Sequence, residues 1–485
     1  MKKKNLLKVL AIVFAVYVIL SWIIPAGYFQ DGKLVADQTT PVGLFSIIRY
    51  PIITLSSSVF LLYGLIVVLI GGLYGVLNKT GAYSKFVEKV VEKNKGKGNK
   101  FIIITIIIFA LLSSLTGLTL PLLILVPFFV TVLLLLGYDK PVAMVSTFGA
   151  ILVGNIGCTY GFNIAGYTNY FLNTGINTEI ISKAIFLVII TFLLIMFVIR
   201  ASKKTVKVDK KKKGLKKKEI VEEHKASAPL YTKTDDSKKS VVPIIVITCF
   251  VVVLAIVGMY NWEIAFKFDV FNNFHEKIMA INIKDYPIMS NILGGVDALG
   301  YWSNYDLAIL IILATILIGW IYNVKAKDFF NGFVEGVKEM LPVAFYMMIA
   351  NIIFLIMNSS STGGTMFATI SNFFLSMTKN FNAVVMVVVS AIGGVFYNDF
   401  PYLLNTLNSQ ITTLYTDTKL YPLIAFIMQS IHGIVQLLVP TSMILFGGLK
   451  YFGISFKEWI KFIWKYVLEI LAISIVIMIV IAVLI

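Results

Sequence analysis

Four clusters of hydroxyl, amide and glycine residues interrupt stretches of this sequence that are otherwise strongly apolar. They occupy residues 113–121, 154–168, 393–408 and 429–448. Irregular backbone is tolerated at membrane depth only where it is buried in protein or lines a cavity. Interrupted helices expose N–H groups that attract carboxylates and C=O groups that attract cations. The clusters therefore predict a central binding site for a small charged molecule.

The side chains and backbone groups that we expect at this site come from all four clusters. They are Thr119, Asn155, Gly157, Thr159, Asn163, Asn398, Asp399, Asn405, Thr441 and Ser442. Any single Ser, Thr or Asn could instead make a contact between helices, so the prediction depends on the clusters taken together. No nucleotide-binding loop, zinc motif or nucleophile elbow occurs, which argues against an ATP-driven pump and against an intramembrane enzyme.

Asp399 is the only carboxylate in the four clusters. An ionised carboxylate at membrane depth is costly, so we expect Asp399 to bind substrate or an ion, or to carry a coupling proton. The alternative is a turn residue at the membrane surface. His432 is the second candidate for proton or ion coupling, and a hydrogen-bonded packing residue is its alternative. The two cysteines and three histidines are scattered, so no metal site is predicted.

A repeated spacing indicates how these residues are positioned. Asn78 and Pro121 are 43 residues apart, and so are Asn358 and Pro401. In both series an apolar run ends at the Asn and a second run is interrupted at the Pro, before a polar break and a further apolar segment. A duplicated membrane unit with interrupted segments is typical of a secondary transporter. The repeat pairs the first cluster with the third and the second with the fourth.

The composition places the chain in a membrane. It is 58% hydrophobic and 14% charged, and its mean hydropathy is +0.87. Many apolar runs reach the roughly 18 to 20 residues that cross a bilayer as a helix, and they lack the alternation of barrel strands. We predict an all-α polytopic membrane protein. The expected segments are 6–25, 56–77, 101–116, 120–136, 141–156, 181–200, 243–260, 305–322, 341–357, 382–396, 402–415, 420–438 and 466–485.

The positive charges lie beside the apolar runs. The formal net charge is +17, and lysine clusters at 93–100, 203–239 and 450–465 adjoin predicted spans. This is the positive-inside pattern rather than a nucleic-acid surface, and it places the N-terminus in the cytoplasm. The segment at 243–260 has no counterpart in the repeat, so the second half enters the membrane in the opposite sense. The result is a pair of inverted-topology repeats with broken helices.

The chain divides into four parts. They are the N-terminal segment with the first inverted repeat (1–200), a lysine-rich cytoplasmic linker (201–241), a connecting membrane segment with an external loop (242–304) and the second inverted repeat (305–485). The linker mixes lysines with acidic residues and has few apolar side chains, which is typical of disorder. In the second repeat, the Ser/Thr/Gly run at 359–365 is expected to be a surface turn rather than an ion site.

Three motifs resemble one transporter family. They are Ser-Trp-Ile-Ile-Pro-Ala-Gly at 21–27, the glycine-rich run at 71–81, and Pro-Thr-Ser at 440–442 followed by Lys-Glu-Trp-Ile-Lys-Phe at 457–462. The chain is similar to the anaerobic four-carbon dicarboxylate carriers, and more narrowly to their YfcC-like branch, which includes arginine–ornithine antiporters. The resemblance implies the ion transporter superfamily fold, in which each inverted repeat carries a re-entrant hairpin and a broken helix, with about 13 membrane segments in all.

The sequence departs from this family where its relatives carry substrate-facing motifs. Leu-Thr-Leu-Pro at 118–121 stands where relatives tend to have adjacent carboxylates, and Asp399 stands near the place of a Pro-Ser-Gly-Ser-Gly run. We favour an antiporter of amino acids, such as arginine–ornithine exchange by alternating access. The alternatives are a dicarboxylate or short-chain carboxylate carrier coupled to Na⁺ or H⁺, and, from another class, a channel.

The expected partners follow from this interpretation. They are a small-molecule substrate and the lipid bilayer, without nucleic acid, and a homodimer is left open. No cofactor is expected, although Na⁺ or H⁺ is left open as the coupling ion. We expect a multi-pass protein of the inner or sole membrane of a bacterial cell.

Overall fold

The structure is a computed structural model that describes residues 6–30, 33–37, 42–211, 228–234, 239–357, 364–378 and 380–484. These residues are almost entirely helical, which confirms the all-α prediction. The elements up to the linker are α1 (Leu6–Ile23), β1 (Gly27–Gln30), β2 (Lys33–Ala36), α2 (Leu44–Ser56), α3 (Ser58–Thr80), α4 (Ala82–Asn94), α5 (Gly98–Thr116), η1 (Pro121–Ile124), α6 (Val126–Leu135), α7 (Lys140–Met144), η2 (Val145–Gly149), α8 (Ala150–Ile156), η3 (Phe162–Gly166), α9 (Tyr167–Leu172) and α10 (Ile180–Lys211).

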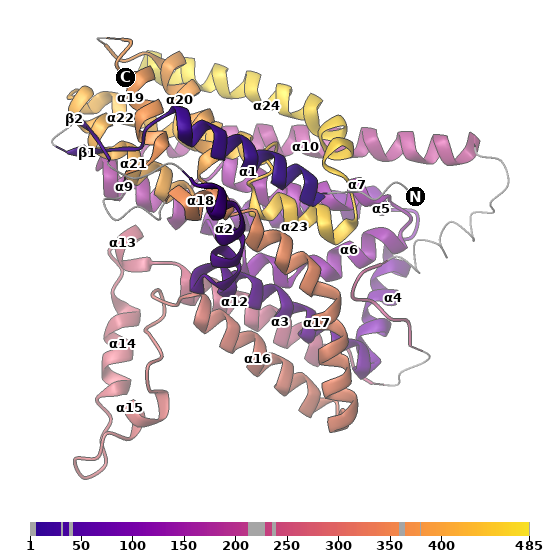
Figure 1. Ribbon diagram of the computed structural model, residues 1–485. Helices are drawn as coiled ribbons and strands as arrows, with labels where there is room; N and C mark the ends of the chain where they lie inside the picture. Colours follow the sequence, from indigo (N-terminus) through magenta and orange to yellow (C-terminus); the bar gives the residue numbers. More distant parts are fainter. Residues whose placement is uncertain are drawn as a thin grey trace.

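After the linker, α12 leads through three short helices to the second half. The elements are α12 (Val242–Met259), α13 (Trp262–Phe266), α14 (Val270–Met279), α15 (Ile288–Leu293), α16 (Asn304–Ile321), α17 (Ala326–Ile349), α18 (Ile352–Met357), α19 (Met366–Leu375), α20 (Ala383–Phe396), α21 (Phe400–Leu414), η4 (Thr418–Leu420), α22 (Tyr421–Gln436), α23 (Met443–Phe452) and α24 (Phe456–Leu484). α13, α14 and α15 form an arm that extends away from the bundle (Figure 1).

The helix boundaries repeat at the interval that the sequence predicts. In the first half, α5, a break and η1–α6 precede α7–α8, a second break and η3–α9. In the second half, α20, a break and α21 precede α22, a second break and α23. The helix ends Thr116 and Phe396 are 280 residues apart, as are Ile156 and Gln436. Both breaks of each half therefore recur at equivalent positions.

Glycines join the two halves where α3 contacts α17. Gly71 lies against Gly336 and Gly75 against Gly332, so the two helices run antiparallel. A Cβ atom at Gly75 would lie 1.9 Å from the carbonyl oxygen of Gly332, and one at Gly336 would lie 1.9 Å from that of Gly71. Small residues at this spacing let helix backbones approach closely in membranes. The opposite directions of these equivalent helices are those expected for an inverted repeat.

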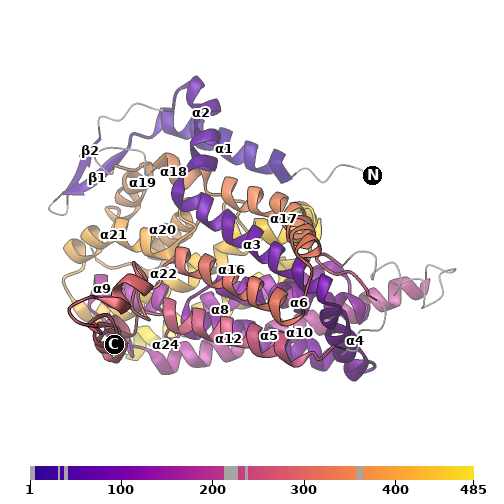
Figure 2. The same ribbon diagram turned by 90° about the horizontal axis from the view of Figure 1, so that it is seen from below.

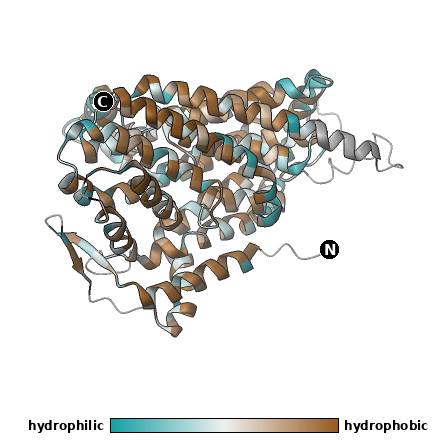
Figure 3. Ribbon diagram, turned by 90° about the horizontal axis from the view of Figure 1, so that it is seen from above, coloured by the Kyte–Doolittle hydropathy of each residue, from teal (hydrophilic) through white to brown (hydrophobic). Residues whose placement is uncertain are grey.

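The outer surface of the bundle is apolar. Within the described ranges, seven helices are long and apolar enough to cross a membrane: α1, α3, α5, α10, α12, α16 and α24. Their outward side chains include Val188, Val253 and Val476, which are 67%, 58% and 54% exposed. Apolar residues follow the length of the helices and polar residues gather near their ends (Figure 3). A continuous apolar surface of this kind is covered by lipid in a membrane protein.

Some expected loops are folded. The region 26–55, expected as an external loop, contains the β1–β2 hairpin and helix α2. The stretch 323–339, expected as a cytoplasmic loop, is mostly the first half of α17, whose mixed polar and apolar residues lack the hydropathy of a membrane span. Residues 212–227 of the predicted linker and 358–363, which hold most of the expected surface turn, lie outside the described residues.

The lysine-bearing segments gather at one end of the bundle. α1 begins at this end, where α4, the far end of α10 and the start of α24 also lie, whereas α24 ends at the opposite end (Figures 1 and 2). We call it the lysine-rich end. Lys140 begins α7 at this end, and its equivalent Lys419 lies in η4, which precedes α22 at the other.

We expect single cysteines introduced as Lys140→Cys and Lys419→Cys to react from opposite faces of the membrane. The two positions are equivalent in the repeats, and an inverted repeat puts equivalent positions on opposite sides. Cys158→Ala and Cys249→Ala supply the background, because these are the two native cysteines. Labelling by a membrane-impermeant maleimide in intact cells and in inside-out vesicles makes the measurement, and the Lys140→Cys site should react from the cytoplasm. Reaction of both sites from one face would contradict the inverted topology.

Candidate functional site: a polar cavity at the helix breaks

A cavity of about 190 Å³ lies where the first break of each half meets α3, α17 and α18. Its polar lining comes from both halves of the chain and from the ends of α12 and α16. The polar residues are Tyr63, Thr119, Asn155, Asn163, Asn304, Asn351, Asn398, Asp399, Tyr402, Gln429, His432, Gln436 and Ser442. None of the described lining residues is Lys or Arg.

In the first half, two breaks are joined by hydrogen bonds. Gly117 ends α5 with a φ of +70°, a left-handed conformation that favours glycine. The carbonyl oxygen of Ser114 accepts from the backbone N–H groups of Thr159 at 3.2 Å and Gly161 at 3.0 Å. The Asn163 side-chain amide donates to the carbonyl oxygen of Gly117 at 3.2 Å. The chain between α8 and η3 thus holds the tip that follows α5.

In the second half, side chains of α22 bind the carbonyl groups that the end of α20 exposes. The Nε2 atom of His432 lies 2.9 Å from the carbonyl oxygen of Tyr397, so this nitrogen carries the proton and donates. The Gln436 amide donates to the carbonyl oxygen of Gly394 at 2.8 Å. His432 is buried. It lines the cavity and also holds the break in place.

The start of α23 is held to the same break. The backbone N–H of Met443 donates to the side-chain oxygen of Asn398 at 2.9 Å, and the Thr441 hydroxyl donates to the carbonyl oxygen of Val395 at 2.8 Å. The pair Gly117–Asn163 in the first half and the pair Asn398–Met443 in the second occupy equivalent positions at the two tips. The site is therefore built twice from similar parts, with different side chains.

Asp399 differs from the other polar groups of the cavity. It precedes α21, but its carboxylate does not cap that helix. Within the part of the chain that the structure describes, no side chain or N–H group donates to this carboxylate and no Lys or Arg pairs with it. Asp399 is only partly buried, because it faces the cavity. A carboxylate left in this state can accept an ammonium group, a guanidinium group or a proton.

The structure brings most of the predicted site residues together. Those that line the cavity are Thr119, Asn155, Asn163, Asn398, Asp399, Ser442 and His432. Gly157, Thr159 and Thr441 do not line it, because their groups hydrogen-bond inside the breaks. Asn405 is exposed on α21 and also lies outside the lining.

The wall that α3, α16 and the α17–α18 junction supply was not predicted from the sequence. It includes Tyr63, Asn304 and Asn351. Asn351 offered a signal, since it is the only amide within the apolar run 341–357 and a buried polar group in such a run needs a reason. Tyr63 offered none, because aromatic residues are frequent in membrane helices.

Comparisons with known proteins place the chain in a family. The model of the C4-dicarboxylate anaerobic carrier family (DcuC) matches residues 4–483. No curated protein matches the chain in sequence. Among solved structures, the YdaH transporter of Alcanivorax borkumensis is 13% identical over 98% of this chain and 97% of that chain, with a TM-score of 0.39, which is too low to support a conclusion. The match over nearly the whole chain confirms the family that the motifs suggested. The chain belongs to the C4-dicarboxylate anaerobic carrier family and is a multi-pass secondary transporter rather than an enzyme.

Proposed function

We propose that this transporter exchanges basic amino acids, such as arginine and ornithine, by alternating access. The observation that carries the proposal is the Asp399 carboxylate, which faces a cavity without a Lys or Arg among its described lining residues. A dianionic substrate would meet this negative charge with no side-chain cation to offset it. An ammonium or guanidinium group would pair with Asp399 and relieve its desolvation cost.

The other end of an amino acid finds suitable groups in the same cavity. Asn155, Asn163 and Ser442 supply amide and hydroxyl groups. α21 and α23 begin at the break that carries Asp399, and helix N-termini favour a carboxylate. The cavity volume of about 190 Å³ is below the roughly 300 Å³ at the lower end for drug-sized ligands, so it suits a metabolite of amino-acid size.

The state of the break carbonyls supports exchange or proton coupling rather than sodium coupling. Transporters bind Na⁺ with carbonyl groups that broken helices leave open. Here protein donors bind these carbonyls in both halves. The acceptors are Ser114, Gly117 and Cys158 in the first half, and Gly394, Val395 and Tyr397 in the second. Sodium would have to displace these donors.

The second candidate is a dicarboxylate or short-chain carboxylate carrier driven by Na⁺ or H⁺. The family description favours it, since it names C4-dicarboxylates. The two candidates differ in the sign of the group that Asp399 meets. A channel fits less well, because two inverted halves around a closed polar cavity suit alternating access.

Proteoliposomes loaded with unlabelled arginine or ornithine should accumulate labelled arginine by counterflow in sodium-free buffer. Vesicles loaded with succinate or fumarate should accumulate nothing above the protein-free control. Replacing choline by Na⁺ outside should leave the counterflow rate unchanged within error. Accumulation of labelled dicarboxylate together with absent arginine counterflow would reject the proposal in favour of the second candidate.

A further inference from the structure

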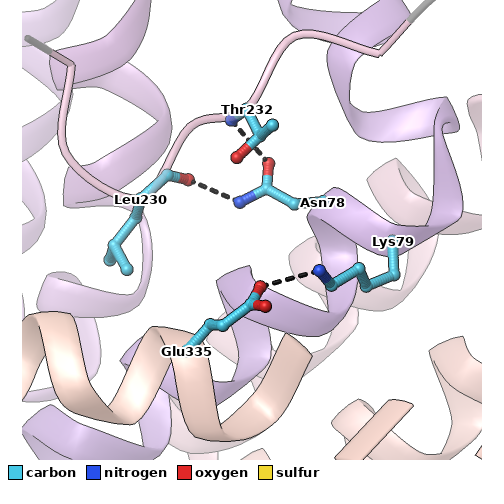
Figure 4. Close-up of polar contacts among 5 residues, drawn as sticks. All are labelled: Asn78, Lys79, Leu230, Thr232 and Glu335. Atoms are coloured by element: carbon cyan, nitrogen blue, oxygen red, sulfur yellow. Dashed lines mark hydrogen bonds and ion pairs between the residues drawn. The ribbon is translucent and has the colours of Figure 1, made fainter. Parts of the chain in front are cut away.

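A short part of the linker lies folded against the lysine-rich end of the bundle. We call residues 228–234 the strap. The side-chain amide of Asn78, at the end of α3, donates to the carbonyl oxygen of Leu230 at 3.0 Å and accepts from the N–H of Thr232 at 3.2 Å (Figure 4). One amide side chain therefore binds two main-chain groups of the strap, as a neighbouring β-strand would.

Further contacts hold the strap to α17. The backbone N–H of Leu230 donates to the Glu339 carboxylate at 2.9 Å. The Leu230 side chain is only 2% exposed, so it is an anchor in the apolar core. Lys79 and Glu335 pair beside it at 2.7 Å and tie α3 to α17 at the same level (Figure 4). This part of the linker is thus specifically bound, which the charge pattern of the sequence did not predict.

The strap also binds α4. The N–H of Thr234 donates to the Ser84 hydroxyl at 3.2 Å, and Lys233 pairs with Glu88 at 3.2 Å. Between α3 and α4 the chain turns at Gly81, whose φ is +72°. The strap therefore bonds to the protein on both sides of this turn, and it fixes the angle between α3 and α4.

A row of aromatic rings leads from the strap toward the cavity. Tyr231 of the strap meets the ring of Tyr83 at 6.2 Å, and Tyr83 meets Tyr74 at 5.5 Å, both edge to face. The Tyr74 hydroxyl donates to the carbonyl oxygen of Ile124 at 2.8 Å. Ile124 ends η1, and Pro121, the first residue of η1, lines the cavity. The strap thus contacts a continuous set of packed groups that reaches the first break.

We propose that the cradle formed by Asn78, Ser84 and Glu339 is a binding site for the chain's own strap, and that the bound strap keeps the lysine-rich side of the cavity closed. Tyr74 joins α3 to η1 on that side, and an opening there must separate the two. Such a separation requires α4, which leads into α5, to move about Gly81. Release of the strap removes the bonds that span this turn and lets the closed layer open.

Solvent access to Val126 measures the opening without any substrate. Val126 follows η1 and is 2% exposed. Val126→Cys, with Cys158→Ala and Cys249→Ala as background, should react slowly with a maleimide supplied at the lysine-rich face. Asn78→Ala should raise this rate on the order of tenfold, because it removes two hydrogen bonds from the closed state. Leu230→Asp should raise it at least as much, because it expels the apolar anchor.

Cleavage by trypsin after Lys233 reports separately whether the strap has left its cradle. Both strap variants should be cleaved faster than the parent. Asn94→Ala is the matched control, because Asn94 bonds only to the carbonyl oxygen of Val90 in its own helix, and it should change neither rate. Faster cleavage with unchanged labelling of the cysteine at 126 would overturn the proposal. Unchanged cleavage in both strap variants would overturn the binding site itself.

Discussion

Asp399→Asn is expected to remove substrate binding while leaving the fold intact. Losing one partner of a desolvated charge pair costs about 2–5 kcal/mol, so affinity for arginine should fall by roughly 30-fold to several thousand-fold. Stability should not fall, because neutralising a carboxylate at membrane depth lowers a desolvation cost. Binding measured by scintillation proximity and thermal unfolding measured in detergent test the two halves of this prediction on one preparation.

Asp417→Asn is the matched control. Asp417 is an exposed carboxylate in the same half of the chain, where it accepts from the N–H of Lys419. It should bind substrate like the parent. Two transport assays on Asp399→Asn then separate the roles of the cavity carboxylate. Loss of counterflow indicates a substrate ligand, whereas retained counterflow with lost accumulation in a pH gradient indicates a coupling proton. Parental behaviour in both assays would contradict basic amino-acid exchange and favour the carboxylate candidate.

The broken helices could be predicted from the sequence because breaks need particular residues. A chain that leaves a helix inside the membrane needs conformational freedom and local hydrogen-bond donors. Gly117 supplies the first and Asn163 the second, and both stand out in an apolar sequence. Pro121 and Pro401 mark the restart of the helix in each half. The break positions and most of the cavity residues were therefore visible in residue types and spacing.

The opposite wall of the cavity could not be predicted in the same way. α3 is apolar on all sides, so no polar face indicates whether Tyr63 points to lipid or to the cavity. Which side faces inward is set by the contact with α17, more than 250 residues away in the sequence. The strap has the same difficulty, because Asn78 binds main-chain groups of Leu230 and Thr232. Main-chain recognition leaves little trace in the identity of the residues that are bound.

The contact between α3 and α17 sets the second large effect, since Gly75→Leu is expected to prevent assembly of the two halves. Even the first carbon of a side chain at Gly75 would lie 1.9 Å from the carbonyl oxygen of Gly332. The obstacle is backbone, which cannot rotate away as a side chain does. Overpacking a core usually costs about 1–3 kcal/mol. Here the two helices must separate along their length, so the loss should exceed that range and abolish the folded, monodisperse protein.

Gly336→Leu should have the same effect, because its Cβ would lie 1.9 Å from the carbonyl oxygen of Gly71. Gly295→Leu is the control, since nothing lies within 4 Å of a Cβ placed there. Yield of monodisperse protein in size-exclusion chromatography and the midpoint of thermal unfolding make the comparison. Normal yield and stability of Gly75→Leu would show that α3 and α17 do not approach at these glycines. In that case Tyr63 and Asn351, which these helices carry to one cavity, would no longer be expected to face the same substrate.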